Sequence, residues 1–131
     1  IKYMHPAARS SVLRPFRLLM LMWLFFSVSF FFNIDFGFLG ILPRSYFGLI
    51  GIFTGPLVHG NLHHISSNSV PVLFLGTILY FFYPKIANRI FLQCYFFTNI
   101  LVWFFGRTFL HIGASGLIYA LAFFLISIGF F

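Results

Sequence analysis

A serine follows a glycine-containing turn and opens a long apolar stretch, in the sequence HIGASGLIYALAFFL at residues 111–125. Gly113 permits an unusual backbone turn just before Ser115, because glycine has no Cβ. We expect a helix to begin at about Ser115, and the first N–H groups of a helix have no partner inside it. A serine hydroxyl can attack a carbonyl carbon while such N–H groups stabilise the resulting oxyanion. Taken alone, the stretch fits an ordinary helix cap at Ser115 better, and a nucleophilic serine is the alternative that this arrangement would also permit.

A second group of polar residues, HGNLHHISSNS at residues 59–69, opens another apolar stretch much earlier in the chain. His64 and Asn68 are four residues apart and therefore share one face of the expected helix. If both helices enter the membrane from the same side, these residues and His59 lie at the depth of Ser115. Leaving such a group unpaired in an apolar medium costs roughly 2–7 kcal/mol. We therefore expect mutual hydrogen bonds or a water-filled cavity, although His64 and Asn68 taken alone also fit ordinary interfacial positions.

The neighbours of Ser115 fit a helix that packs closely against another helix. Tyr119 shares a face with Ser115, because the two residues are four apart, and we expect it mainly to pack. Gly116 and Ala120 place two small residues on one face of the same helix, which lets a neighbouring backbone approach closely.

A zinc site is the alternative chemistry, since His59 and His63 are four residues apart and His64 is adjacent. Zinc hydrolases usually add a carboxylate as a ligand or as the general base. The chain contains no Glu, and its single acidic residue, Asp35, lies in an earlier segment. We therefore expect no metal and no other cofactor. A serine mechanism would use a serine–histidine dyad rather than a triad with a buried Asp.

The composition indicates lipid as the solvent of the chain. Of its 131 residues, 61% are hydrophobic and only 7% are charged, whereas a soluble domain has roughly 45–50% apolar and about 25% charged residues. The net charge of +7 comes from positive residues beside apolar segments, which indicates membrane topology rather than a nucleic-acid partner. We therefore predict a multi-pass membrane protein whose partners are the bilayer and other membrane proteins.

The elements that must position the polar groups are apolar helices. Helices are favoured over barrel strands because the alternation of a barrel strand is absent. We expect four of them in one domain over residues 1–131, at about residues 18–32, 64–83, 90–105 and 115–131. Spanning the hydrocarbon takes about 20 helical residues, so the first and third need flanking residues to extend them. The Gly- and Pro-rich segment 33–58 is expected to be interfacial or partly re-entrant.

Positive charge sets the expected orientation, because Lys and Arg collect on the cytoplasmic side. One side of the bundle carries Lys2, Arg9, Arg14, Arg17, Lys85 and Arg89, and the other carries Arg44 and Arg107. We therefore expect a cytoplasmic N-terminus and polar groups that face the extracytoplasmic side.

Two motifs resemble those of the rhomboid family of intramembrane serine proteases. GASGLIY at residues 113–119 is similar to the Gly-x-Ser-Gly pattern of the family with its following tyrosine. HGNLHHISSN at residues 59–68 is similar to the family's histidine followed by His-x-x-x-Asn. The resemblance covers nearly the whole chain. It implies an all-α, polytopic, rhomboid-like bundle, of which these residues form four of six helices.

The resemblance also implies roles for the candidate residues. Ser115 would be the nucleophile, and the oxyanion hole would comprise His64, Asn68 and the Ser115 N–H group. His59 would support the cavity, and Tyr119 would pack beside the catalytic histidine. Gly113 and Gly116 belong to the serine motif. The implied activity is cleavage of transmembrane-helix substrates near the extracytoplasmic face.

The chain departs from the family pattern at two places. The first outer loop usually carries a Trp-Arg pair, where this chain reads LPRSYFGLIGIF, and Pro43–Arg44 is expected to supply some of the same anchoring. The family's general base is a histidine on the sixth helix, and none of the histidines of this chain matches that position: His5, His59, His63, His64 and His111. We expect the base beyond Phe131. The alternative is a catalytically inactive relative that binds transmembrane helices without cleavage.

Overall fold

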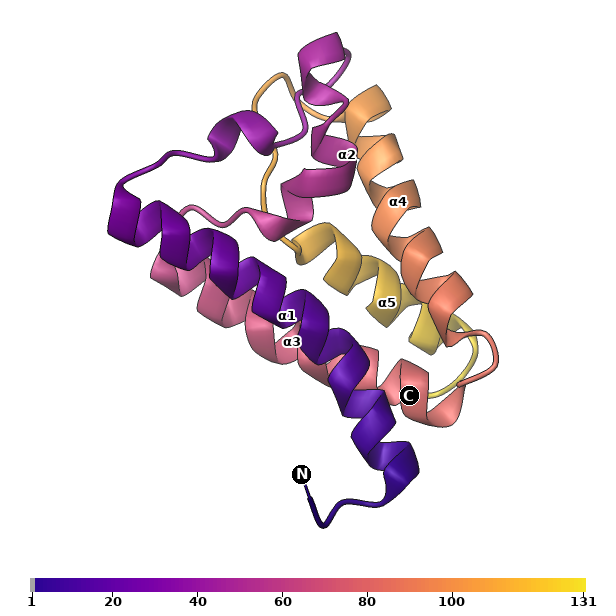
Figure 1. Cartoon of the computed structure of the whole chain (residues 1–131). Coiled ribbons are helices and arrows are strands. Elements are labelled where there is room, and N and C mark those ends of the chain that lie inside the picture. Colours follow the sequence, from indigo (N-terminus) through magenta and orange to yellow (C-terminus); the bar gives the residue numbers. More distant parts are fainter. Residues whose placement is uncertain (1) are drawn as a thin grey trace.

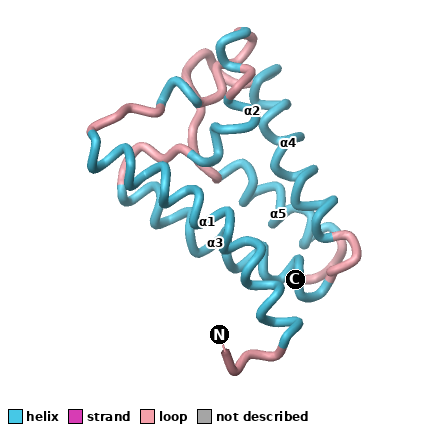
Figure 2. Tube along the Cα trace, in the orientation of Figure 1, coloured by secondary structure: helices cyan, strands magenta, loops and turns pink. Residues whose placement is uncertain are grey.

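The computed structural model describes residues 2–131, and all the regular elements of that range are helical. Figure 2 shows helices joined by loops. The α-helices are α1 (Pro6–Phe32), α2 (Gly51–Thr54), α3 (Leu62–Phe82), α4 (Ala87–Phe105) and α5 (Ser115–Ser127). Three short 3₁₀ turns, Gly37–Leu39, Tyr46–Gly48 and Gly55–Leu57, lie between α1 and α3. The predicted all-α fold is confirmed.

Helix α1 begins at Pro6 rather than at about residue 18. Proline is tolerated at the first helical position, where its missing N–H group would have no partner. The Nδ1 atom of His5 accepts a hydrogen bond from the Ala7 N–H group at 3.2 Å, which caps the helix. The first turns of α1 therefore form among basic residues that the search for apolar segments left out.

Helix α5 ends at Ser127 rather than continuing to Phe131. Gly129 has a φ of +79°, the left-handed conformation that commonly ends helices. The N–H groups of Gly129 and Phe130 donate to the carbonyl oxygens of Ile126 and Leu125, each at 3.0 Å. This pair of bonds is a Schellman motif, and it turns the chain away from the helix axis.

Helices α1 and α3 lie side by side, and α5 lies between α3 and α4 and contacts both (Figure 1). Helices α1 and α3 are long and apolar enough to cross a membrane. Gly76 of α3 permits their close contact, because a Cβ atom there would lie 2.6 Å from the Cβ of Pro15. The core between α3 and α5 contains Leu79, Leu117, Leu121 and Leu125.

The segment between α1 and α3 gathers at the end of the bundle away from the N-terminus (Figure 1). It packs against α4, where Asn99 donates to the Ile52 carbonyl at 2.8 Å and the Tyr95 hydroxyl donates to the Phe53 carbonyl. An isolated antiparallel bridge joins Ile41 to His111 through two backbone hydrogen bonds of 2.8 Å. The segment is therefore tied both to α4 and to the chain that leads into α5.

Candidate active site

A glycine turn places the start of α5 against a histidine of α3. Gly113 has a φ of +101°, which side chains other than glycine rarely adopt. A Cβ atom at this position would lie 2.7 Å from Cε1 and Nε2 of His64. Glycine is therefore required twice, for the backbone conformation and for the space that the imidazole of His64 occupies.

Ser115 is the first residue of α5, and Ala114 is its N-cap. The alternative in which the Ser115 side chain caps the helix is therefore wrong, since α5 has no side-chain cap. The Ser115 residue is half-buried. The Gly113 N–H group donates to the Gly55 carbonyl at 2.9 Å, which holds the turn before the serine in place.

His59 connects α3 to the start of α5. Its Nε2 atom lies 3.1 Å from Nδ2 of Asn68 and 3.3 Å from the backbone nitrogen of Ala114. A backbone N–H group can only donate, so Nε2 must accept and the ring hydrogen must be on Nδ1. Burial, followed by the nearby His64, lowers the pKa of His59 from 6.5 to about 4. His59 is therefore a neutral acceptor with a defined tautomer at neutral pH.

The structure brings most of the sequence-predicted site residues together. His59 and Asn68 are 5% and 8% exposed, and the ring of His64 lies 4.9 Å from the ring of His59 in an edge-to-face arrangement. Gly113 completes this cluster beside the first turn of α5. His63 is exposed and lies apart from it on the surface of α3. Among residues 2–131, no three His, Cys, Asp or Glu side chains are grouped to hold a metal ion.

Two residues of the serine motif differ from the central cluster in their surroundings. Tyr119 is 74% exposed, because α5 buries its opposite face through Leu117, Leu121 and Leu125. The expectation that Tyr119 packs beside a catalytic histidine stays a prediction, because none of the histidines of this chain matches that residue. Gly116 faces α4, since a Cβ atom there would lie 2.7 Å from Cγ2 of Thr98. Gly116 thus provides the close helix contact predicted for it.

Sequence reasoning assigned no role to Asn61, which caps α3. Its Oδ1 atom accepts a hydrogen bond from the His64 N–H group at 2.8 Å. Because this bond fixes the first turn of α3, it also fixes the backbone of His64. The signal was present in the sequence: asparagine immediately before an apolar helix is a common N-cap.

Arg44 fastens the loop after α1 to the end of α4. Its Nη1 atom donates to the carbonyl oxygens of Phe104 and Gly106 at 3.1 and 2.9 Å, and Nη2 donates to Thr108 at 3.2 Å. Carbonyl groups at a helix C-terminus have no partner inside the helix. The Trp103 indole returns a bond of 2.9 Å to the Ser45 carbonyl. Arg44 therefore anchors this loop to protein.

Comparison with known proteins finds a family whose domain includes the candidate site residues. The family described as the Rhomboid domain matches residues 46–131, a range that includes the whole cluster and Ser115. Uncharacterized proteins of Mycobacterium tuberculosis and Mycobacterium bovis are 34% identical to the chain over 106 residues. These alignments cover 70% of the chain and 41% of each relative, so the chain spans less than half of their length. No solved structure matches the chain.

Proposed function

Because the chain belongs to the rhomboid family of membrane proteins, we propose that it carries the nucleophile and oxyanion hole of an intramembrane serine protease. In this proposal the Ser115 Oγ atom attacks the carbonyl carbon of a substrate peptide bond, and its proton passes to a general base. The C–N bond then breaks, the amine leaves with that proton, and water hydrolyses the Ser115 ester. The base is a histidine supplied from outside residues 1–131.

Three donors are available for the oxyanion. The first N–H groups of α5, including that of Ser115, have no acceptor inside the helix. The Asn68 carboxamide has two N–H bonds, and the contact with His59 uses one of them. The His64 imidazole, against the Gly113 turn, is the third. Removing one such donor typically lowers kcat by about 10²–10³-fold.

The observation that carries the proposal is the double contact of His59. Its Nε2 atom accepts hydrogen bonds both from Asn68 of α3 and from the Ala114 N–H group next to Ser115. Two motifs far apart in the sequence therefore meet at the start of α5. A random placement of polar residues in apolar helices gives no reason for that junction.

The proposed substrates are transmembrane helices of other membrane proteins. Peptide bonds inside a helix are shielded by their own hydrogen bonds, so the substrate has to unwind into a polar, hydrated site before Ser115 can attack. We propose that the N-terminus is cytoplasmic and that cleavage occurs near the extracytoplasmic face. The excess of Lys and Arg at the ends of the helices on the N-terminal side supports this orientation.

The test uses the full-length protein that contains residues 1–131, reconstituted with a model transmembrane substrate. Ser115→Ala is expected to abolish cleavage, while Ser127→Ala is expected to retain it, because Ser127 lies at the other end of α5 and bonds to the Phe123 carbonyl. Labelling of wild-type protein, but not of Ser115→Ala, by a fluorophosphonate would support the same role. Unchanged cleavage by Ser115→Ala refutes the proposal. Substrate binding without cleavage by the wild type supports the inactive alternative.

A further inference from the structure

The buried ring of His59 has a second nitrogen, Nδ1, that makes no hydrogen bond within residues 2–131. Nε2 accepts hydrogen bonds from Asn68 and Ala114, so Nδ1 carries the hydrogen. The Leu57 carbonyl lies near the ring, but among residues 2–131 no group accepts that hydrogen with the geometry of a hydrogen bond, although His59 is only 5% exposed. Buried donors are almost always paired with protein or with ordered water.

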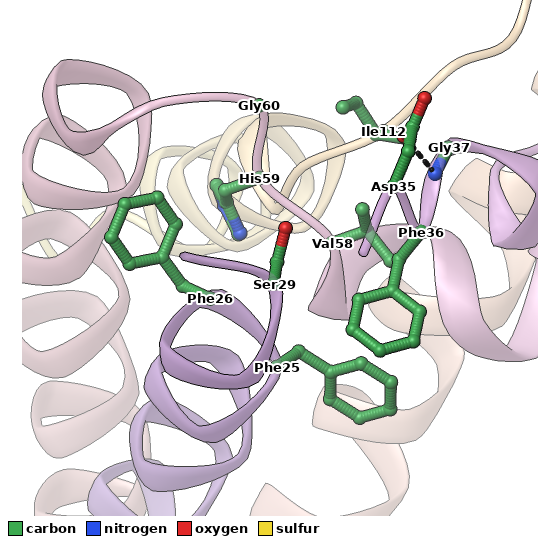
Figure 3. Close-up of a pocket in the computed structure, with 10 residues that line it drawn as sticks. All are labelled: Phe25, Phe26, Ser29, Asp35, Phe36, Gly37, Val58, His59, Gly60 and Ile112. Carbon is green, nitrogen blue, oxygen red and sulfur yellow. Dashed lines mark hydrogen bonds between the residues drawn. The ribbon is translucent and has the colours of Figure 1, made fainter. Parts of the chain in front are cut away.

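A small pocket of about 60 Å³ borders His59 on the side of α1. Figure 3 shows the imidazole of His59 and the hydroxyl of Ser29 facing each other across this pocket. One water needs about 10–15 Å³ of such volume, provided that polar partners surround it. The pocket therefore has both the room and the polar groups to hold water.

Ser29 has acceptor capacity to spare. Its Oγ atom donates its single hydrogen to the Ile34 carbonyl at 2.6 Å, so its lone pairs are free to accept. Asp35 also lines the pocket, but its carboxylate turns toward Gly37, whose N–H group donates to Oδ1 at 2.8 Å (Figure 3). Ser29 is thus the hydroxyl that faces the His59 ring across the pocket.

We propose that this pocket holds a resident water, which accepts the hydrogen of His59 Nδ1–H and donates to Ser29 Oγ. Through this water, Ser29 is a positioning residue that keeps the hydrogen of His59 on Nδ1. In the other tautomer, Nε2–H would point at two further donors, Asn68 and the Ala114 N–H group. The water site stands on geometry alone, whereas its effect on catalysis rests on the proposed function.

Threonine and valine at position 29 form a matched pair, because they have nearly the same shape and differ in one hydroxyl group. NMR of the full-length protein, labelled with ¹⁵N at histidine, reports the tautomer of His59 and magnetisation transfer from water to its Nδ1–H. Wild type and Ser29→Thr are expected to show both the Nδ1–H tautomer and the water contact. Ser29→Val is expected to lose the water contact and to lower kcat about tenfold, the order of one buried hydrogen bond, with KM little changed. Ser27→Val, on α1 outside the pocket lining, is the control.

Equal spectra and equal kcat for Ser29→Thr and Ser29→Val would overturn the proposal, as would a wild-type spectrum without water transfer to His59. If Ser29→Val does not fold, the spectra of wild type and Ser29→Thr still test whether water contacts the Nδ1–H group of His59. The NMR readout does not depend on proteolysis. A water contact in a protein that cleaves nothing therefore refutes the proposed protease function and leaves the water site standing.

Discussion

Replacing Gly113 with alanine tests whether the turn before Ser115 positions His64. The added Cβ would lie 2.7 Å from the imidazole carbon Cε1, whereas non-bonded carbon atoms prefer about 3.5–4.0 Å. The imidazole would therefore have to move by about 0.8–1.3 Å, which is the difference between these distances. A φ of +101° adds backbone strain of order 1–3 kcal/mol.

Displacement of a site group by about 1 Å can lower turnover about 10²-fold. Gly113→Ala is therefore expected to lower kcat by about this factor and to lower the thermal unfolding temperature. Gly129→Ala is the matched control, because Gly129 has a φ of +79° and an added Cβ would meet nothing within 4 Å. It carries the backbone strain without displacing a side chain.

The assay compares cleavage of a transmembrane reporter and thermal unfolding for both variants of the full-length protein. Gly129→Ala is expected to lose stability and to keep its activity per folded molecule. Equal losses of activity in the two variants would refute the proposal that the turn at Gly113 fixes the position of the His64 imidazole. Gly113→Ala is expected to change the ¹⁵N signals of the His64 ring more than those of the His59 ring.

Two further predictions concern packing and pH. Gly76→Val should lower stability by about 1–3 kcal/mol through overpacking, since a Cβ at Gly76 already lies 2.6 Å from Pro15; an unchanged denaturation midpoint in detergent would contradict this packing. The pKa of His59 is lowered from 6.5 to about 4, so the unfolded chain binds a proton before the folded chain does as the pH falls. The stabilising effect of neutral His59 is therefore complete above pH 6.5 and is lost as the pH falls toward 4. Thermal unfolding should depend less on pH in His59→Gln, which keeps His64 and Asp35 as the other titrating groups near the site; equal pH dependence would count against the assignment.

Sequence patterns predicted the helices whose apolar residues face lipid or core. The start of α5 at Ser115 and the end of α4 at Phe105 agree with the expected positions. The patterns missed the first turns of α1, because Arg9 and Arg14 are good helix formers that a search for apolar runs passes over. The end of α5 was missed because Gly129 acts through its backbone conformation and leaves the apolar run uninterrupted.

The sequence indicated which residues form the polar cluster, but it did not indicate which hydrogen bonds and contacts join them. Spacing put His64 and Asn68 on one face, and the structure shows Asn68 bonded to His59 and His64 packed on Gly113. The Ala114 N–H group contributes through the backbone, so its side chain gives no signal in the sequence. The pocket between His59 and Ser29 depends on the contact of α1 with the loop before α3, which local patterns do not encode.

The bridge between Ile41 and His111 has a mechanical consequence. Together with the hydrogen bond from the Gly113 N–H group to the Gly55 carbonyl, it ties the chain leading into α5 to the segment between α1 and α3. Arg44 joins that segment to the end of α4 through hydrogen bonds to the Phe104 and Gly106 carbonyls. Residues 41–55 are therefore joined through hydrogen bonds to the backbone that leads into Ser115, and a displacement of these residues would shift the turn before the serine.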